Sequence, residues 1–132
     1  MTSEARLPVR AHEDDAGLDL FALEDVNLPP SEGRKVRTGI ALAIPQGHVG
    51  MIADRSSMAI KGLKTAGGII DAGYRGEVQV VLWNISRQAA QIRHGEKVAQ
   101  LLIIPIVTPA VQEVTQLSET MRGEGGFGST GK

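Results

Sequence analysis

Hydrophobic residues fall in short runs in which they alternate with polar residues, and glycine or proline separates most of these runs. Alternation with a period of two is typical of β-strands, whose successive side chains point to opposite faces of a sheet. The 132 residues include 16 glycines and 6 prolines, which leaves little room for long uninterrupted helices. The pattern therefore predicts an all-β fold made of short strands and tight turns.

The predicted strands extend along most of the chain. In residues 18–22 the aliphatic side chains alternate with Asp19, which places Asp19 on the opposite face of the strand. Residues 97–107 form the most apolar run, and Pro105 is expected to end its hydrogen-bonded ladder or to sit at a bulge. The full set of predicted strands is 7–10, 18–22, 34–44, 49–53, 78–84, 91–92, 97–107 and 111–114.

One segment, residues 54–63, has the pattern of a short helix, with Asp54 or a serine as the N-cap and Gly62 as the stop. Arg55-Ser56-Ser57 at its start is a candidate anion site, because hydroxyls, a guanidinium and free backbone N–H groups would meet there. Simple capping by the serines explains the local sequence equally well. No Gly-x-x-x-x-Gly-Lys-Ser/Thr pattern is present, so the segment is not a P-loop.

The glycine-bearing segment 66–77 is the stretch around which the rest of the chain is arranged. Two apolar residues lead into Asp71, and Tyr74 follows the bend. Together with the strand 78–84, this pattern predicts a β-hairpin with a carboxylate at its mouth. Its glycines leave backbone groups unshielded, so that the main chain could bind a flat polar ligand. From this segment alone, ordinary turn roles for Asp71 and Gly73 are the simpler interpretation.

The end of the chain changes in character. Residues 121–132 contain five glycines and a single aromatic side chain, too little to order the segment by itself. One interpretation is a flexible tail; the other is an arm that folds over a ligand, with charge from Arg122 and a stacking face from Phe127. We therefore divide the chain into a β-domain, 1–117, and a flexible glycine-rich arm, 118–132.

Composition limits the classes of function. A length of 132 residues suits one domain, and the absence of cysteine excludes disulfides and thiolate metal sites. A net charge of −1 gives no general attraction to nucleic acid or to acidic membranes. Without a membrane-spanning run or a signal-peptide core, a cytoplasmic location is expected.

Among the acids, Asp71 could deprotonate a water, and Asp19 could help hold a hydrated Mg²⁺ on phosphates.

Taken together, five ordered segments of the chain resemble the motifs of the homotrimeric all-β deoxyuridine triphosphatase (dUTPase) family. They extend from near the N-terminus to the last residues, and their order and spacing are those of the family. The five segments are DAGLDL at 15–20, RSSMA at 55–59, GIIDAGYRGE at 68–77, GEKVAQL at 95–101 and RGEGGFGSTG at 122–131.

The resemblance implies a jelly-roll-like subunit and a homotrimer whose active sites lie between subunits, each completed by the C-terminal arm of a third chain. It also implies cleavage of dUTP between its α- and β-phosphates, which gives dUMP and pyrophosphate with Mg²⁺. By the same resemblance, Asp71 activates the attacking water and Tyr74 packs under the deoxyribose. Asp19 supports the hydrated metal through water.

The remaining roles are also implied by the family pattern. The backbone around Gly68 and Ile70 binds the uracil edge, and Phe127 covers the base. Three places depart from the commoner family residues: Ser57 stands where many members have glycine, and Thr65 where many have an asparagine that helps bind the base. Residues 96–98, Glu-Lys-Val, replace the commoner Asp-Arg-Ile. The residues expected to face the phosphates are Arg55, Ser56, Ser57, Gln100, Arg122, Gly128, Ser129 and Thr130.

Two alternative functions stay open beside this one. A dCTP deaminase would share the fold and an Arg-Ser-Ser segment, but its chemistry needs a catalytic glutamate against the base. The Asp71 segment and the glycine-rich arm favour dUTP hydrolysis instead. A non-catalytic nucleotide-binding trimer could use the same scaffold, and only turnover separates it from an enzyme.

Overall fold

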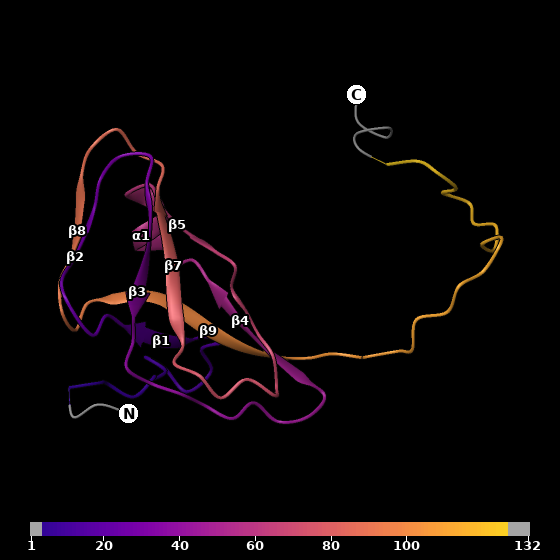
Figure 1. The fold of residues 1–132 in the computed structure, drawn as a ribbon, viewed down its shortest axis with the longest axis horizontal. Helices are drawn as coiled ribbons and strands as arrows, with labels where there is room; N and C mark the ends of the chain where they lie inside the picture. Colours follow the sequence, from indigo (N-terminus) through magenta and orange to yellow (C-terminus); the bar gives the residue numbers. More distant parts are fainter. Residues whose placement is uncertain (1–3, 127–132) are drawn as a thin grey trace.

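The structure is a computed structural model that describes residues 4–126 (Figure 1). In this part of the chain, strands dominate and the one helix is short, which confirms the all-β prediction. The elements are β1 (Leu18–Phe21), β2 (Val26–Leu28), β3 (Gly33–Arg37), β4 (His48–Ala53), α1 (Ser56–Ile60), β5 (Leu63–Ala66), β6 (Ile69–Ile70), β7 (Gln79–Asn84), β8 (Ala90–Ile92) and β9 (Lys97–Pro105).

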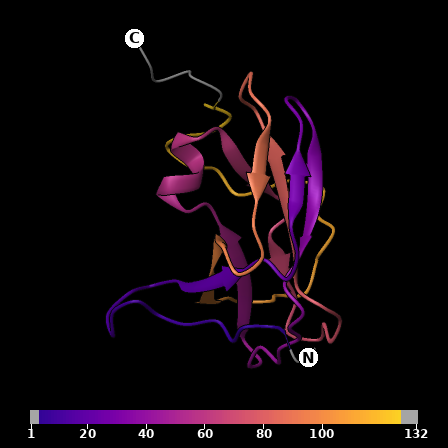
Figure 2. The same cartoon turned by 90° about the vertical axis from the view of Figure 1, so that its left-hand side faces the viewer.

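The strands form three antiparallel sheets. A four-stranded sheet has the order β1-β9-β4-β6, a three-stranded sheet has the order β3-β7-β5, and β2 pairs with β8. Figures 1 and 2 show the strands of the three-stranded sheet side by side, with the long strand β9 running across one end of them. This is the sandwich-like arrangement expected of a jelly-roll subunit.

All three sheets contribute to one hydrophobic core. In β4 and β7 the fully buried residues alternate with less buried ones, as the pattern of period two predicts. Val80 of β7 and Leu101 of β9 are almost completely buried, and Met58 anchors α1 to the same core. Residues 106–126 contribute no buried hydrophobic side chain, so the packed body of the molecule ends with β9.

The outer face of the four-stranded sheet is divided into a polar end and an apolar part. Residues directly opposite each other in neighbouring strands share a face. Asp19, Gln100 and Ala53 form one such row, at the polar end. Further along β4 and β9, an apolar outer face is formed by Val49 opposite Ile104 and by Met51 between Leu102 and Ile69.

The predicted hairpin is wrong in its pairing. β6 pairs with β4, whereas β7 pairs with β3 and β5, so the Asp71 turn connects two sheets. Close contact between β6 and β4 explains this choice. The Ile52 N–H donates to the Gly68 carbonyl at 2.7 Å, and a Cβ on Gly68 would lie 2.5 Å from the Ile52 carbonyl oxygen. Only glycine allows this approach.

Several predicted element boundaries are also corrected. The strand expected at 34–44 ends at Arg37, because Gly39 adopts a φ of 70° and the Thr38 hydroxyl bonds to the Val78 carbonyl. The strand expected at 7–10 is reduced to an isolated bridge from Val9 to Asp19. Residues 111–114 form no strand, and β2 and β5 were not predicted as strands.

The helix is shorter than expected, but its stop is confirmed. Its N-cap is Arg55 and no side chain caps it, whereas Gly62 follows its end with a φ of 76°. Beyond β9, residues 106–126 extend away from the sheets and are mostly exposed (Figure 1). In residues 4–126 no helix combines the length and apolar character that a membrane crossing requires.

Candidate functional site

The structure brings four of the residues predicted to face phosphates, Arg55, Ser56, Ser57 and Gln100, into one pocket of about 400 Å³, called here the phosphate pocket. It lies at the polar end of the outer face of the four-stranded sheet. The loop before β1, the junction between β4 and α1, and β9 each form one wall. Its lining residues are Ala11, Asp15, Ala16, Gly17, Asp19, Arg55, Ser56, Ser57 and Gln100.

Charge in the phosphate pocket is arranged around Asp19. One oxygen of its buried carboxylate lies 3.0 Å from Arg55 Nε, and the other lies 2.7 Å from Lys97 Nζ. Sequence reasoning missed Lys97, although it begins the apolar strand β9 within the fourth motif. Two cations therefore share Asp19, and because Asp15 also lines the pocket, two acids are matched by two cations. Ser56 and Ser57 expose hydroxyl groups beside Arg55.

A second polar cluster, missed by sequence reasoning, fixes the segment that begins the phosphate pocket. The Asp54 carboxylate accepts hydrogen bonds from the Thr65 N–H at 2.7 Å, from the Thr65 hydroxyl at 2.6 Å and from Lys64 Nζ at 2.5 Å. Gln100 Nε2 donates to the Asp54 carbonyl at 2.8 Å. Thr65 thus uses its hydroxyl to hold Asp54.

The bonds to Asp54 also set its protonation. Burial acts to raise the pKa of this carboxyl, but the hydrogen bonds from Lys64 and Thr65 outweigh burial and lower the pKa to about 2. Asp54 is therefore ionised at all physiological pH values, and its contacts with β5 persist there. This explains why Asp54 does not cap α1, since its carboxylate already has three donors.

Asp71 and Tyr74 lie in a different pocket, of about 250 Å³, called here the nucleoside pocket. Asp71 follows β6 directly and is exposed. None of the ion pairs found among residues 4–126 includes it. β6 is the edge strand of its sheet, so one edge of its backbone has no strand partner within the described residues. The pocket is lined by Ile69, Ile70, Asp71, Tyr74, Glu77 and Gln79.

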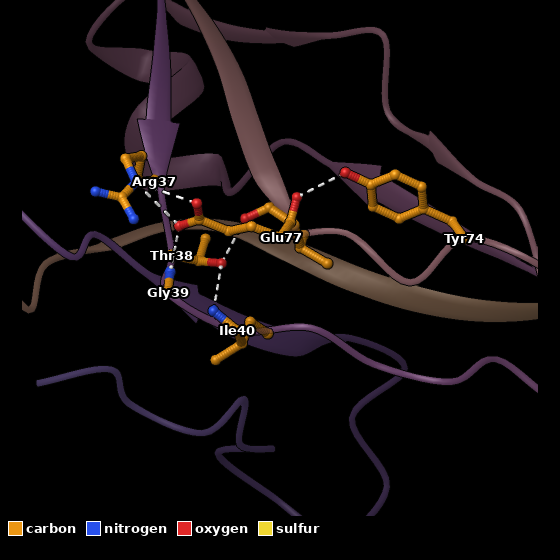
Figure 3. A network of polar contacts seen from close by, with 7 residues as sticks. Arg37, Thr38, Gly39, Ile40, Tyr74 and Glu77 are labelled. Carbon is orange, nitrogen blue, oxygen red and sulfur yellow. Dashed lines mark hydrogen bonds and ion pairs between the residues drawn. The ribbon is translucent and has the colours of Figure 1, made fainter. Parts of the chain in front are cut away.

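The turn that carries Asp71 and Tyr74 is closed by its own backbone. The Tyr74 N–H donates to the Asp71 carbonyl at 3.0 Å, and the Tyr74 hydroxyl donates to the Glu77 carbonyl at 3.0 Å. Figure 3 shows the ring of Tyr74 reaching toward Glu77, whose side chain points the other way, to Arg37 and Gly39. The aromatic ring is thus held in place although it is 45% exposed.

The phosphate pocket and the nucleoside pocket share no lining residue on the subunit. The residues named from the sequence are divided between them: Ile70, Asp71 and Tyr74 line the nucleoside pocket, and Gly68 lines neither pocket. Arg122 is exposed in the segment after β9, where its Nε donates to the Gly125 carbonyl at 2.7 Å. The other arm residues named from the sequence, Phe127, Gly128, Ser129 and Thr130, lie outside the described residues.

Comparison with known proteins decides the family, because a family model described as dUTPase matches residues 3–131. The chain belongs to the dUTPase family. It is 45% identical to the deoxyuridine 5′-triphosphate nucleotidohydrolase of Gloeothece citriformis, over 96% of this chain and 90% of that protein.

Solved structures of dUTPases agree with the fold. A dUTPase of Staphylococcus bacteriophage 80alpha with dUpNHpp superimposes with a TM-score of 0.93 at 34% identity, and covers 99% of this chain and 95% of that chain. A mutant dUTPase from phage phi11 of S. aureus, described with a structural Mg(II) ion, gives a TM-score of 0.81 at 34% identity. It covers 87% of this chain and 93% of that chain.

Proposed function

We propose that this chain hydrolyses dUTP to dUMP and pyrophosphate, the activity that its membership of the dUTPase family indicates. The observation that carries the proposal is the pair of chemically different pockets on one subunit. One offers cations and hydroxyls to a phosphate chain, and the other offers a carboxylate, a tyrosine and a free backbone edge to a nucleoside. A deoxynucleoside triphosphate needs both.

In the phosphate pocket, Arg55 is the main phosphate ligand of the proposal. A guanidinium can donate two parallel hydrogen bonds to phosphate oxygens. Arg55 Nε donates to Asp19 and Nη1 donates to the Lys97 carbonyl at 3.4 Å, so Nη2 and the second hydrogen of Nη1 would donate to the phosphate. Ser56 and Ser57 add hydroxyl donors. Gln100 lines the pocket while one of its amide hydrogens is used by the Asp54 carbonyl, so its second amide hydrogen can donate to a phosphate oxygen.

In the nucleoside pocket, the open edge of β6 would bind uracil. The alternating C=O and N–H groups of uracil are complementary to backbone groups, whereas the amino group of cytosine would leave buried groups mispaired, a strong basis for rejection. The Gly68 carbonyl already accepts the Ile52 N–H, so Gly68 would contribute its own N–H group. Tyr74 would lie under the deoxyribose, where a 2′-hydroxyl would clash with the ring.

Asp71 is the proposed general base. Its exposed carboxylate would accept a proton from a water molecule while the water oxygen bonds to the α-phosphorus. The bond from the α-phosphorus to the bridging oxygen breaks with its electron pair on that oxygen, and pyrophosphate leaves. The cations Arg55 and Lys97 would counter the negative charge that develops on the phosphate chain.

We further propose that the complete site forms between copies of this chain in a homotrimer. The two pockets share no lining residue on one copy, and the apolar outer face around Met51 and Leu102, on the same sheet as the phosphate pocket, is a surface that a second copy would cover. Residues 1–117 would then be the assembling domain. Residues 118–132 would be the arm that closes the site of another subunit and excludes water.

A hydrated Mg²⁺ fits the acids of the phosphate pocket better than a dehydrated ion does. Within residues 4–126, no three His, Cys, Asp or Glu side chains gather as a metal cage. Both oxygens of Asp19 are paired with cations, so Asp19 would hold the ion through water. Mg²⁺ suits this set because it keeps several waters and few protein ligands, and when bound it neutralises phosphate charge.

The cytoplasmic location of the protein stays a prediction.

The test is incubation of the protein and Mg²⁺ with dUTP, dCTP, dTTP or UTP, followed by identification of the products. Pyrophosphate and dUMP from dUTP alone are expected. Ammonia released from dCTP would indicate deamination, and tight binding of dUTP without any product would indicate a non-catalytic trimer. Either result would overturn the proposal.

A further inference from the structure

Glu77 lies between the nucleoside pocket and the three-stranded sheet, and its two ends have different partners. Its backbone carbonyl accepts the Tyr74 hydroxyl at 3.0 Å. Its carboxylate accepts the Gly39 N–H at 2.8 Å and Arg37 Nε at 3.1 Å, both beyond the end of the pocket (Figure 3). The residue therefore joins the Tyr74 turn to the end of β3.

The position of the Tyr74 ring depends on this junction. The ring lies against the backbone of Gly76, where a Cβ would be 2.4 Å from the tyrosine oxygen. The tyrosine hydroxyl donates to the Glu77 carbonyl. The ring is therefore supported by two adjacent residues, Gly76 and Glu77. A side chain that is 45% exposed has few packing neighbours to fix it otherwise. Movement of the backbone at Gly76 and Glu77 would therefore move the ring.

The carboxylate of Glu77 fixes that backbone. Burial acts to raise the pKa of Glu77, but the hydrogen bonds from Gly39 and Arg37 outweigh it, and the pKa lies below its ordinary value. The next residue is bonded on both sides, since the Val78 N–H donates to Ile40 and its carbonyl accepts the Thr38 hydroxyl. Glu77 is thus the first residue after the turn whose side chain is anchored to the end of β3.

We propose that Glu77 is a positioning residue for sugar recognition: its carboxylate holds the turn so that Tyr74 lies at the depth that admits a 2′-deoxyribose and excludes a ribose. The proposal rests on the proposed function, in which Tyr74 packs under the sugar. Glu77 itself touches neither the phosphates nor the reacting atoms in this scheme. A loosened Tyr74 would give way to a 2′-hydroxyl, so selectivity would fall more than the rate with dUTP.

The test compares kcat/KM for dUTP with kcat/KM for UTP in Glu77→Ala, Glu77→Gln and Arg37→Gln. Glu77→Gln keeps an oxygen that accepts the Gly39 N–H, and Arg37→Gln removes only the ion pair. Both variants therefore keep the proposal testable if Glu77→Ala does not fold. We expect the dUTP to UTP ratio to fall by about tenfold in Glu77→Ala, the scale of one lost hydrogen bond, and by less in the other two. An unchanged ratio in all folded variants would overturn the proposal.

Asp25→Asn is the matched control. Asp25 also accepts one arginine and one backbone N–H, from Arg93 at 3.0 Å and from His94 at 2.7 Å, but it lines neither pocket of the site. Its removal should leave the dUTP to UTP ratio at the wild-type value. If Asp25→Asn lowered the ratio as much as Glu77→Ala, the effect would be general loosening and the proposal would fail.

A second measurement needs no turnover. Tyr74 is the only tyrosine in the chain, so ¹³C-labelled tyrosine gives ring signals from this residue alone. In the ligand-free protein these signals should shift in Glu77→Gln and stay in place in Asp25→Asn; no shift in Glu77→Gln would contradict the proposal. Tyr74→Ala tests the role of the tyrosine itself. If this variant keeps the wild-type ratio of kcat/KM for dUTP to that for UTP, Tyr74 does not select the sugar and the proposal for Glu77 fails with it. If the wild-type protein does not hydrolyse dUTP at all, the proposed function is refuted instead.

Discussion

Replacing Asp54 by asparagine tests how the start of the phosphate pocket is held. Asparagine can still accept the Thr65 N–H at the position of Oδ1, but it loses the charge that faces Lys64. The pKa of Asp54 is lowered from 3.8 to about 2 in the folded chain. At about 1.4 kcal/mol for each pKa unit, a lowering of this size corresponds to roughly 2 kcal/mol of stability at neutral pH.

The sign of the pH dependence follows from the direction of this shift. The folded pKa of Asp54 lies below the unfolded value, so its ionised form stabilises the fold. That contribution is fully present above about pH 4, near the unfolded value, and is lost as the pH falls through about 2. The difference in stability between wild type and Asp54→Asn should therefore be largest at pH 5 to 7 and should shrink in acid.

Urea unfolding followed by the fluorescence of Trp83, the single tryptophan, measures this difference. All samples should have the same protein concentration, because the proposed association of copies would also contribute to stability. Glu32→Gln is the control, since Glu32 pairs with Arg34 at an exposed site, where ion pairs contribute little. A loss of stability in Asp54→Asn that stays constant down to pH 2.5 would refute the electrostatic explanation.

Three further changes test the site itself. Asp71→Asn should lower kcat with dUTP by about a thousandfold with little change in KM, as expected for a general base, and a near-normal kcat would remove Asp71 from that role. Deletion from Arg122 onward should leave a folded protein whose turnover falls about a hundredfold or more, and an undiminished rate would show that the segment is only a tail. Gly68→Ala should lower the free energy of unfolding by about 1–3 kcal/mol and weaken dUTP binding, because the new Cβ meets the Ile52 carbonyl. Gly73→Ala, with open space around it, should be nearly neutral. Equal effects of the two variants would contradict the close β4–β6 contact.

The sequence predicted most of what depends on alternation. The structure confirms the strand that ends at Pro105 and the placement of Asp19 on the strand face opposite the aliphatic residues. It also confirms that the helix stops at Gly62. Asp19 and Gln100 meet in one pocket because their strands are paired and both side chains point to the same face. The order of the family motifs, and not the alternation of polar and apolar residues, predicted that Asp19 and Gln100 belong to one site.

The errors arose where tertiary contacts decide local structure. The pattern around Ile70 indicates a strand but does not specify its partner, and the close contact with β4 decides the pairing. Asp54 has the sequence signature of an N-cap, yet donors from β5 ten and eleven residues later compete for its carboxylate. The apolar alternation continues past Arg37, but the positive φ of Gly39 ends the strand. β2 is only three residues long, too short to show a period.

The division of the active site between copies of the chain is the central claim, and complementation between two inactive variants measures it directly. Asp71→Asn lacks the nucleoside half of the function and Arg55→Ala lacks the phosphate half, so each should be nearly inactive alone. After the two are unfolded together and refolded as mixed trimers, about a quarter of the sites should receive both intact halves from different chains, and activity should return to about that fraction of wild type. Mixed trimers that stay as inactive as the parent variants would contradict the claim.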